Sequence, residues 1–225
     1  MRKHFKYVAA AIVAVGFSSA FSGSYEDWFQ SLKRDEPALV EYLMKRGFDP
    51  NTIDPDGIPS LYYALREGSL KSADLLIASP QTKVDDRTPA DETPLMMASL
   101  RGQTQVARKL IARGAHVNKT GWTPLHYAAT SGHVDIIKLL LDESAYIDAE
   151  SPNGTTPLMM AAHYGTREAV KLLLDAGADP AVKNQLGLGA ADFAKGAGRE
   201  DLAKQLAVAA AAFNEKYRKP AAPSR

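Results

Sequence analysis

Apolar and small residues recur along the chain in blocks that predict pairs of short helices. The clearest block spans residues 121–141, with the sequence GWTPLHYAATSGHVDIIKLLL. Thr123 can cap a first helix with its hydroxyl, and Pro124 suits the first helical position. Gly132 can end that helix in a left-handed conformation, and a second helix with apolar residues at 136–141 follows. One helical hairpin cannot bury so broad an apolar surface, so the pattern predicts neighbouring units.

The same block recurs with a period close to 33 residues. Counted from the leucine of Thr-Pro-Leu, the equivalent residues are Leu61, Leu95, Leu125, Leu158 and Ala191. An alanine follows each of them after three residues, and a glycine follows after seven. Because several offsets agree at once, the chain resembles the ankyrin-repeat family from about Trp28 to about Phe213. The resemblance implies an all-α solenoid of stacked helix-turn-helix units that are joined by β-hairpin fingers.

The resemblance implies about six helical pairs within an ankyrin-repeat domain of residues 21–213, including a cap at each end. We predict an N-terminal cap at 25–51, repeats at about 54–83, 88–117, 118–150 and 151–183, and a C-terminal cap at 184–213. Trp28, Phe29 and Leu32 are expected to cover the exposed end of the stack, and residues 214–225 are expected to form a flexible tail. The connection at 114–121 is three residues shorter than its counterpart at 177–187. It therefore predicts a stunted finger and a notch in the row of fingers.

Residues 1–20 read as a secretory signal peptide. Arg2, Lys3 and Lys6 precede an apolar stretch at 8–17, and small residues at 18–20 fit cleavage near Ala20. The apolar stretch is well short of the roughly 20 residues that span a bilayer, which favours a cleaved signal over a retained anchor. The signal and the absence of cysteine indicate a periplasmic protein of a Gram-negative bacterium, with secretion beyond the periplasm left open.

Composition and motifs offer little chemistry. Without cysteine, the sequence excludes disulfides, thiolate metal sites and a cysteine nucleophile. After removal of the predicted signal, 24 basic and 26 acidic residues remain, which gives no electrostatic case for nucleic acid or an anionic membrane. The sequence shows no recognisable catalytic, metal or cofactor motif. We therefore expect no catalytic residue, no bound metal and no cofactor. His126 and His133 are expected to be structural, and Asn118 and Asn153 to form turns rather than carry glycans.

The ankyrin resemblance also implies a protein-binding surface on the concave face, built from finger tips and from the residues before each glycine break. Carried onto this sequence, the candidate helix residues are Arg66, Glu67, Leu100, Arg101, Thr130, Ser131, His163 and Tyr164. The candidate finger residues are Asp56, Glu92, Trp122 and Thr155. Aromatic and arginine side chains anchor many interfaces, so Arg101, Trp122, His163 and Tyr164 are the preferred contacts.

We therefore expect a non-catalytic scaffold in the cell envelope, monomeric apart from one partner protein that its concave face grips. A sharper alternative is an immunity-type inhibitor of a toxic periplasmic enzyme, a role similar to that of some exported bacterial ankyrin proteins. Other proteins that the chain resembles assist oxidative-stress enzymes. The competing class is a hydrolytic enzyme that uses His163 with nearby carboxylates.

Overall fold

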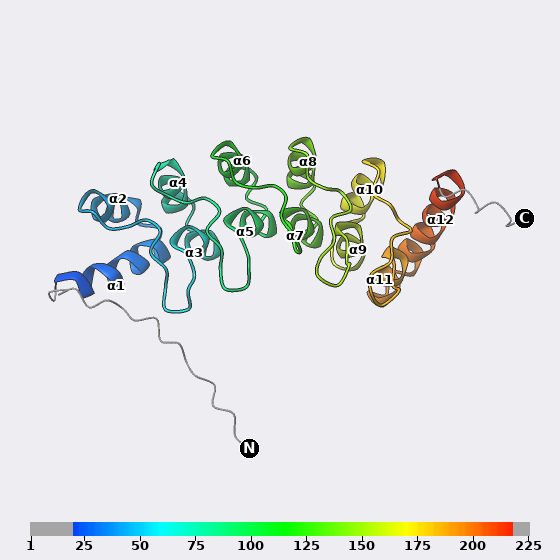
Figure 1. The fold of residues 1–225 in the computed structure, drawn as a ribbon, viewed down its shortest axis with the longest axis horizontal. Coiled ribbons are helices and arrows are strands. Elements are labelled where there is room, and N and C mark those ends of the chain that lie inside the picture. Colours follow the sequence, from blue (N-terminus) through cyan, green and yellow to red (C-terminus); the bar gives the residue numbers. More distant parts are fainter. Residues whose placement is uncertain (1–19, 218–225) are drawn as a thin grey trace, which may run out of the picture.

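The computed structural model describes residues 20–217, within which twelve α-helices form one row of six pairs (Figure 1). The first helices of the pairs make one layer and the second helices make the other, and each pair contacts its neighbours (Figure 1). The predicted all-α stack of six pairs is confirmed. The helices are α1 Ala20–Lys33, α2 Pro37–Lys45, α3 Ser60–Glu67, α4 Leu70–Ala78, α5 Pro94–Leu100, α6 Thr104–Ala112, α7 Pro124–Ser131, α8 Val134–Asp142, α9 Pro157–His163, α10 Arg167–Asp175, α11 Ala190–Gly196 and α12 Glu200–Tyr217.

Both ends of the chain differ in extent from the predicted segments. The predicted signal peptide lies outside the described residues except for Ala20, at which α1 begins. Helix α12 continues through Tyr217, so residues 214–217 of the predicted tail are helical, and residues 218–225 lie outside the described part. Between residues 20 and 217, no helix is both long and apolar enough to cross a membrane.

Threonine and proline begin the first helices of the middle units, as the motif predicts. Thr93 Oγ1 accepts the backbone N–H of Met96 at 3.2 Å, and Thr156 Oγ1 accepts that of Met159 at 3.4 Å. These bonds satisfy one of the unpaired donors at each helix start. Gly132 ends α7 at φ 70°, a left-handed conformation that other residues rarely adopt. The boundaries of the first helices therefore follow directly from local sequence.

Small residues allow the first helices to pack closely. The leucines of Thr-Pro-Leu at 95, 125 and 158 are fully buried, as are the alanines three residues later. Gly165 shows how close the approach is, because a Cβ there would lie 2.4 Å from the backbone oxygen of Ala129 in the neighbouring helix α7. The recurring leucine, alanine and glycine of the repeat thus fix the distance between neighbouring first helices.

The N-terminal pair is joined to the stack by aromatic side chains. Trp28 is fully buried, stacks on Phe48 with ring centroids 4.7 Å apart, and donates its Nε1–H to Ser60 Oγ at 2.7 Å. Phe29 meets Tyr63 edge-on at 5.2 Å. These residues do not simply cover the exposed end of the stack. Trp28 is a core residue that ties α1 to α3, because its indole N–H needs a buried partner.

A ladder of hydrogen bonds joins the connections between successive pairs. In each unit an Asn or Asp side chain accepts a backbone N–H of the next unit, as Asn51 does from Lys83 at 2.8 Å. Asn118 accepts from Tyr146 at 2.8 Å and also donates its Nδ2–H to the Ser144 carbonyl at 2.9 Å. The equivalent pairs are Asp85 with His116 and Asp148 with Asp179. Asn118 thus has a structural partner, consistent with the turn expected there.

The fingers are tight turns that follow the ladder residues. In the full-length fingers a polar residue three positions after the ladder residue accepts the backbone N–H groups of the turn, as Asp54 does from Asp56 and Ile58. Within residues 20–217 the only β-pairing is an isolated bridge between Ile53 and Pro59. The fingers therefore close by turn hydrogen bonds and contain no strand in the described part of the chain.

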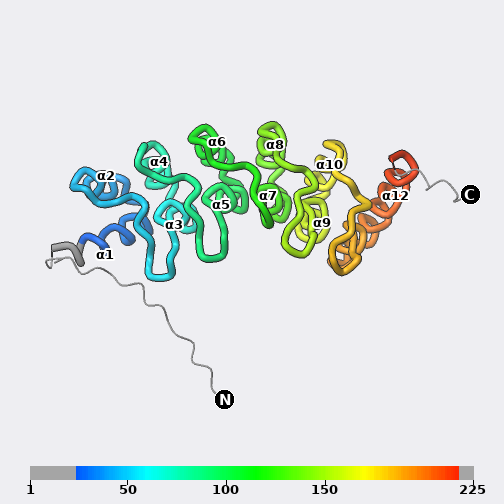
Figure 2. Tube along the Cα trace, viewed as in Figure 1, coloured from blue at the N-terminus to red at the C-terminus, as the bar shows by residue number. Residues whose placement is uncertain are grey.

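The connection between α6 and α7 is the shortened one, and its finger protrudes less than its neighbours in Figure 2. Asn118 lies both at the ladder position and at the position where the other fingers carry their turn acceptor. Since its side chain is bonded to the next unit, it cannot also close its own finger. The predicted notch is present, and the three missing residues are those that separate ladder and turn elsewhere.

His126 connects α7 to the following finger from a fully buried position. The Thr123 backbone N–H donates to Nδ1 at 3.1 Å, so the proton of the neutral ring is on Nε2, which donates to the Thr155 carbonyl at 2.9 Å. Met96 and Met159 take the same position in their helices, where their sulfur atoms accept the equivalent N–H. Burial is the main reason that the pKa of His126 is lowered to about 4.

The buried His126 predicts that stability falls in mild acid. Because its folded-state pKa of about 4 is below the ordinary value of 6.5, the contribution to stability is complete above pH 6.5 and is lost as the pH falls toward 4. The loss should approach about 3 kcal/mol in urea denaturation. His126→Met copies the neighbouring units and should flatten this dependence. An equally steep dependence in the variant would contradict the assignment.

Candidate protein-binding face

The fingers and the first helices together form one surface, which we call the first-helix face. Two residues after each leucine of the repeat, or its equivalent, a large side chain lies on this face or just beneath it. These residues are Tyr63, Met97, Tyr127, Met160 and Phe193, and all except the buried Met97 are partly exposed. Three residues further along each helix are Arg66, Leu100, Thr130, His163 and Gly196. The two positions are one helical turn apart, so they present a continuous stripe.

An apolar hollow of about 200 Å³ lies in the middle of the first-helix face. Three successive first helices and one finger line it. The lining residues are Leu100 of α5, Trp122 of the short finger, Tyr127 and Thr130 of α7, and Met160 of α9. Each of them is partly exposed, which means that the hollow is open to a partner and not part of the core. Leu100, Trp122 and Thr130 were predicted contacts, and the structure brings these three together.

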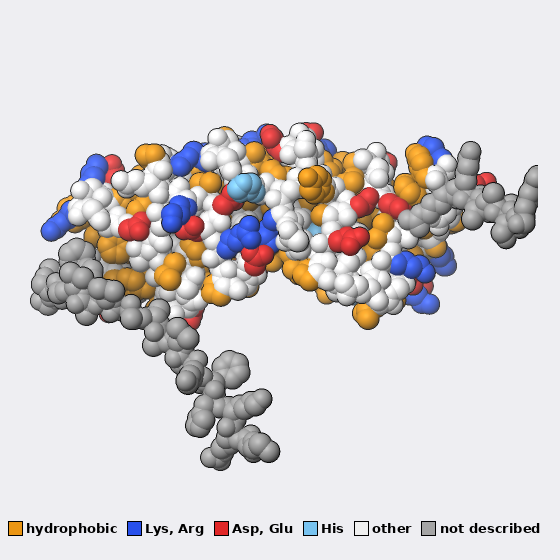
Figure 3. All heavy atoms as spheres, in the orientation of Figure 1, with side chains coloured by type: hydrophobic (Ala, Val, Ile, Leu, Met, Phe, Trp, Pro, Cys, Tyr) orange, Lys and Arg blue, Asp and Glu red, His pale blue; other side chains and the backbone are white. Residues whose placement is uncertain are grey.

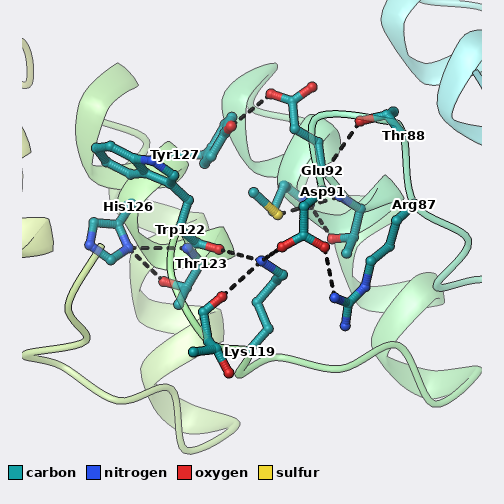
Figure 4. Close-up of polar contacts among 12 residues, drawn as sticks. Arg87, Thr88, Asp91, Glu92, Lys119, Trp122, Thr123, His126 and Tyr127 are labelled. Atoms are coloured by element: carbon teal, nitrogen blue, oxygen red, sulfur yellow. Dashed lines mark hydrogen bonds and ion pairs between the residues drawn. The ribbon is translucent and has the colours of Figure 1, made fainter. Parts of the chain in front are cut away.

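Lys119 holds the short finger in place of the missing turn acceptor (Figure 4). Its side chain is only 5% exposed, and its ammonium donates to the carbonyls of Thr120 at 2.9 Å and Trp122 at 3.3 Å. The same ammonium donates to Asp91 of the preceding finger at 2.5 Å. Trp122 next to it meets the His126 ring edge-on at 5.2 Å. Lys119 therefore fixes the backbone of Trp122, while His126 contacts the indole that lines the hollow.

Asp91 occupies the turn position that is glycine in the other fingers, such as Gly121 and Gly154. Its φ of 61° is in the left-handed region, which aspartate tolerates better than most residues. Its carboxylate accepts from Arg87 at 2.7 Å as well as from Lys119. Hydrogen bonds from Lys119 and then Arg87 lower the pKa of Asp91. This residue therefore links two fingers, a role that glycine could not perform.

Glu92, in the finger just before α5, bridges the first helices α3 and α7 on either side of it. Its Oε2 accepts the hydroxyl of Tyr62 from α3 at 2.5 Å, and its Oε1 accepts the hydroxyl of Tyr127 from α7 at 2.7 Å (Figure 4). Burial, followed by the bond to Glu92, raises the pKa of both tyrosines, so both stay neutral at physiological pH. Glu92 was predicted as a partner contact, and the structure gives it this internal role on the half-exposed face.

Several other predicted contacts also have internal partners. Arg101 donates to the Arg66 carbonyl at 2.5 Å, at the end of α3. The Arg66 guanidinium lies over the Tyr63 ring at 5.0 Å, with its Nε 3.4 Å from Glu67. Arg101 is exposed and Arg66 is partly exposed, so both side chains still reach the surface. Arg101 directly follows α5 and the predicted contact His163 ends α9, with α7 packed between the two helices.

The remaining predicted residues lie at the ends of α7 and α9 and on finger tips. His163 donates from Nδ1 to the Phe193 carbonyl at 3.0 Å, while Tyr164 beside it is 63% exposed. The Thr130 hydroxyl donates to the His126 carbonyl at 2.7 Å, and Ser131 is partly exposed. Asp56 is an exposed finger residue. Thr155 is buried, and its carbonyl accepts from His126. Its side chain therefore cannot contact a partner.

Sequence reasoning did not select Tyr127 or Met160, although both line the hollow. The signal was present, because a large residue recurs two positions after the repeat leucine in every unit.

In the space-filling view, lysine and arginine are interspersed with aspartate and glutamate over the face shown (Figure 3). Among residues 20–217, no three potential metal-binding side chains converge. The hollow is the part of this surface where apolar side chains from three first helices meet.

The family model described as ankyrin repeats (3 copies) matches residues 29–120, 74–153, 95–184 and 143–216. The computed structure is similar to the crystal structure of an ankyrin repeat domain from Acinetobacter baumannii AYE, with a TM-score of 0.69 and 25% sequence identity. The similarity covers 81% of this chain and 96% of that one. The match therefore extends over nearly the whole of the solved domain.

Curated relatives share part of the chain. Ankyrin repeat and SAM domain-containing protein 6 of Rattus norvegicus is 34% identical over 129 residues, 55% of this chain and 15% of that protein. Protein phosphatase 1 regulatory subunit 27 of Mus musculus is 31% identical over 93 residues, 40% of this chain and 60% of that protein. An ankyrin repeat protein of Rickettsia bellii is 30% identical over 128 residues, 52% and 35% respectively. The chain thus matches less than two thirds of each of these relatives.

The bridge at Glu92 predicts energetic coupling between neighbouring units. Glu92→Ala should lower the free energy of unfolding by about 2 kcal/mol, because two tyrosine hydroxyls lose a charged acceptor. Tyr127→Phe should cost less in the alanine background than in the wild type. A double-mutant cycle by urea denaturation measures this coupling. Costs that add to within about 0.5 kcal/mol would show that the two side chains act independently.

The buried ammonium of Lys119 gives a second prediction. Lys119→Met should destabilise the protein by about 2 kcal/mol, because the short finger loses its charge-assisted bonds. The indole N–H resonance of Trp122 should shift in the NMR spectrum, since Lys119 bonds its carbonyl. Lys138→Met on the exposed side of α8 is the control and should change stability by less than about 0.5 kcal/mol. An unshifted Trp122 resonance would argue against the role of Lys119.

Proposed function

The chain belongs to the ankyrin-repeat family, and we propose that it is an exported, non-catalytic scaffold that holds a partner protein against its first-helix face. The ankyrin repeats match residues 29–216, and such repeats imply a protein-binding scaffold. We propose three further features: export to the periplasm, a monomeric scaffold and a contact centred on the hollow. Residues 1–20 motivate the first feature through their basic and apolar pattern.

The apolar hollow is the observation that carries this proposal. Its volume of about 200 Å³ is smaller than the roughly 300–1,000 Å³ of sites that enclose a small molecule. A hollow of this size suits one large side chain of a partner. The surrounding stripe of first-helix residues gives the contact area beyond it, because a stable interface needs about 800 Å² on each side.

The lining residues are of the kinds that carry binding energy. Trp122 and Tyr127 offer large rigid surfaces with few rotatable bonds, and Met160 adapts its shape to what it contacts. Lys119 and Glu92 hold the two aromatic residues in place before any partner arrives. A face ordered in advance loses less conformational entropy on binding, which supports a binding role for it.

A test in cells addresses export and binding together. The full chain with a C-terminal tag is expressed in a Gram-negative host, and the cells are fractionated and crosslinked. We expect the tagged protein in the periplasmic fraction without residues 1–20, and crosslinked to a specific protein. Leu100→Ala with Met160→Ala should reduce that crosslink at least tenfold at an unchanged melting temperature.

Val208→Ala is the matched control, because Val208 is 70% exposed on α12 and far along the chain from the hollow. It should leave the crosslink intact. Retention of the tagged protein in the cytoplasm would refute export. Crosslinking that ignores the loss of Leu100 and Met160 would refute the hollow as the contact.

A further inference from the structure

We propose that the partner segment places a large apolar side chain in the hollow and a neighbouring lysine or arginine against Glu92. This inference rests on the proposed function and specifies the chemistry of the partner. It follows from the position of Glu92 beside the hollow and from the absence of a cation beside its carboxylate among the described ion pairs.

Tyr127 joins the hollow to the carboxylate. Its ring lines the hollow, and its hydroxyl donates to Glu92 Oε1 at 2.7 Å. The apolar surface and the negative charge are therefore separated by no more than one tyrosine side chain. Figure 4 shows Glu92, Tyr127 and Trp122 in this arrangement. A single short segment of a partner can reach both.

None of the ion pairs formed by residues 20–217 includes Glu92, so its negative charge has no cationic partner there. Its two hydrogen-bond donors, Tyr62 and Tyr127, are neutral groups that stabilise the carboxylate without cancelling its charge. The guanidinium of Arg66 lies near Glu67 at 3.4 Å and Asp54 at 3.9 Å. Since a carboxylate offers about four acceptor positions, two hydroxyl donors leave room for a cation.

Covering this face changes the energy of the carboxylate. Glu92 is partly exposed in the free protein, so water solvates its charge. A partner that filled the hollow with an apolar segment alone would remove that water and leave a charge without a counter-ion, which is unfavourable. A lysine or arginine beside the apolar side chain removes this penalty. An acidic residue there would add repulsion, so the site discriminates between segments by charge.

A peptide selection with the full chain tests the inference. The probe is a phage-displayed library of random 12-residue peptides. We expect the enriched peptides to carry leucine, methionine, phenylalanine or tryptophan within four positions of lysine or arginine. The strongest peptide is synthesised, and its affinity is measured by calorimetry at low and physiological salt.

Three substitutions separate the two halves of the site. Glu92→Gln removes the charge, keeps an acceptor oxygen for one of the two tyrosine hydroxyls, and should weaken the peptide at least tenfold. Leu100→Ala should weaken it to a similar degree. Glu168→Gln removes an exposed charge on α10 and should leave the affinity within twofold. Circular dichroism and urea denaturation check that each variant is folded.

A second measurement does not depend on the folding of any variant. Replacing the basic residue of the peptide by glutamine should weaken its binding to the wild-type protein at least tenfold. Equal binding of the two peptides, or of the original peptide to Glu92→Gln, would overturn the inference. If Leu100→Ala still abolished binding in that case, the proposed function would stand. Failure to enrich any peptide that depends on Leu100 or Glu92 would count against both.

Discussion

The structure depends on the close approach of neighbouring first helices. Alanine follows each repeat leucine by three residues, and at Gly165 even a methyl group would collide with the backbone of α7. At this spacing the leucines fill the space between helices, and side chains such as Asn118 reach the backbone of the next unit. Because each unit contacts only its neighbours, local contacts add up along the row. The same contacts fix the first-helix face, so its shape is a property of the stack and not of any single helix.

The three-residue deletion between α6 and α7 alters this regular pattern at the centre of the row. Asn118 takes the ladder position and cannot close its own turn, so Lys119 closes it with an ammonium that lies almost out of contact with water. A buried ammonium needs a negative partner, and Asp91 of the preceding finger provides one. Trp122 follows in the same finger and lines the hollow. A short deletion thus leads, through one compensating ion pair, to an aromatic side chain held on the first-helix face.

Sequence periodicity was sufficient for the fold because it records local requirements. The threonine caps, the glycine that ends α7 and the shortened finger are all encoded within a few residues of where they act. The candidate site was predicted only in part. Leu100, Trp122 and Thr130 followed from family offsets, whereas Glu92 meets tyrosines 30 residues before it and 35 after it. Such contacts depend on how far each helix is rotated toward the face, which periodicity does not give. Tyr127 and Met160 were missed because the candidates were restricted to the fingers and to the residues just before each glycine break.

Internal bonds on the face do not disqualify its residues from binding. The hydroxyl of Tyr127 is held by Glu92 while its ring faces the hollow, so one side chain serves the stack and the surface at once. The backbone of Trp122 is held by Lys119 while its indole remains partly exposed. Side chains fixed in this way cost little further entropy when a partner covers them, whereas a loose loop would have to be ordered first. What a partner must still overcome is the removal of water from charged groups, and next to the hollow that cost falls on the Glu92 carboxylate. In the proposed complex the apolar hollow supplies attraction, and the carboxylate beside it selects which partners can use that attraction.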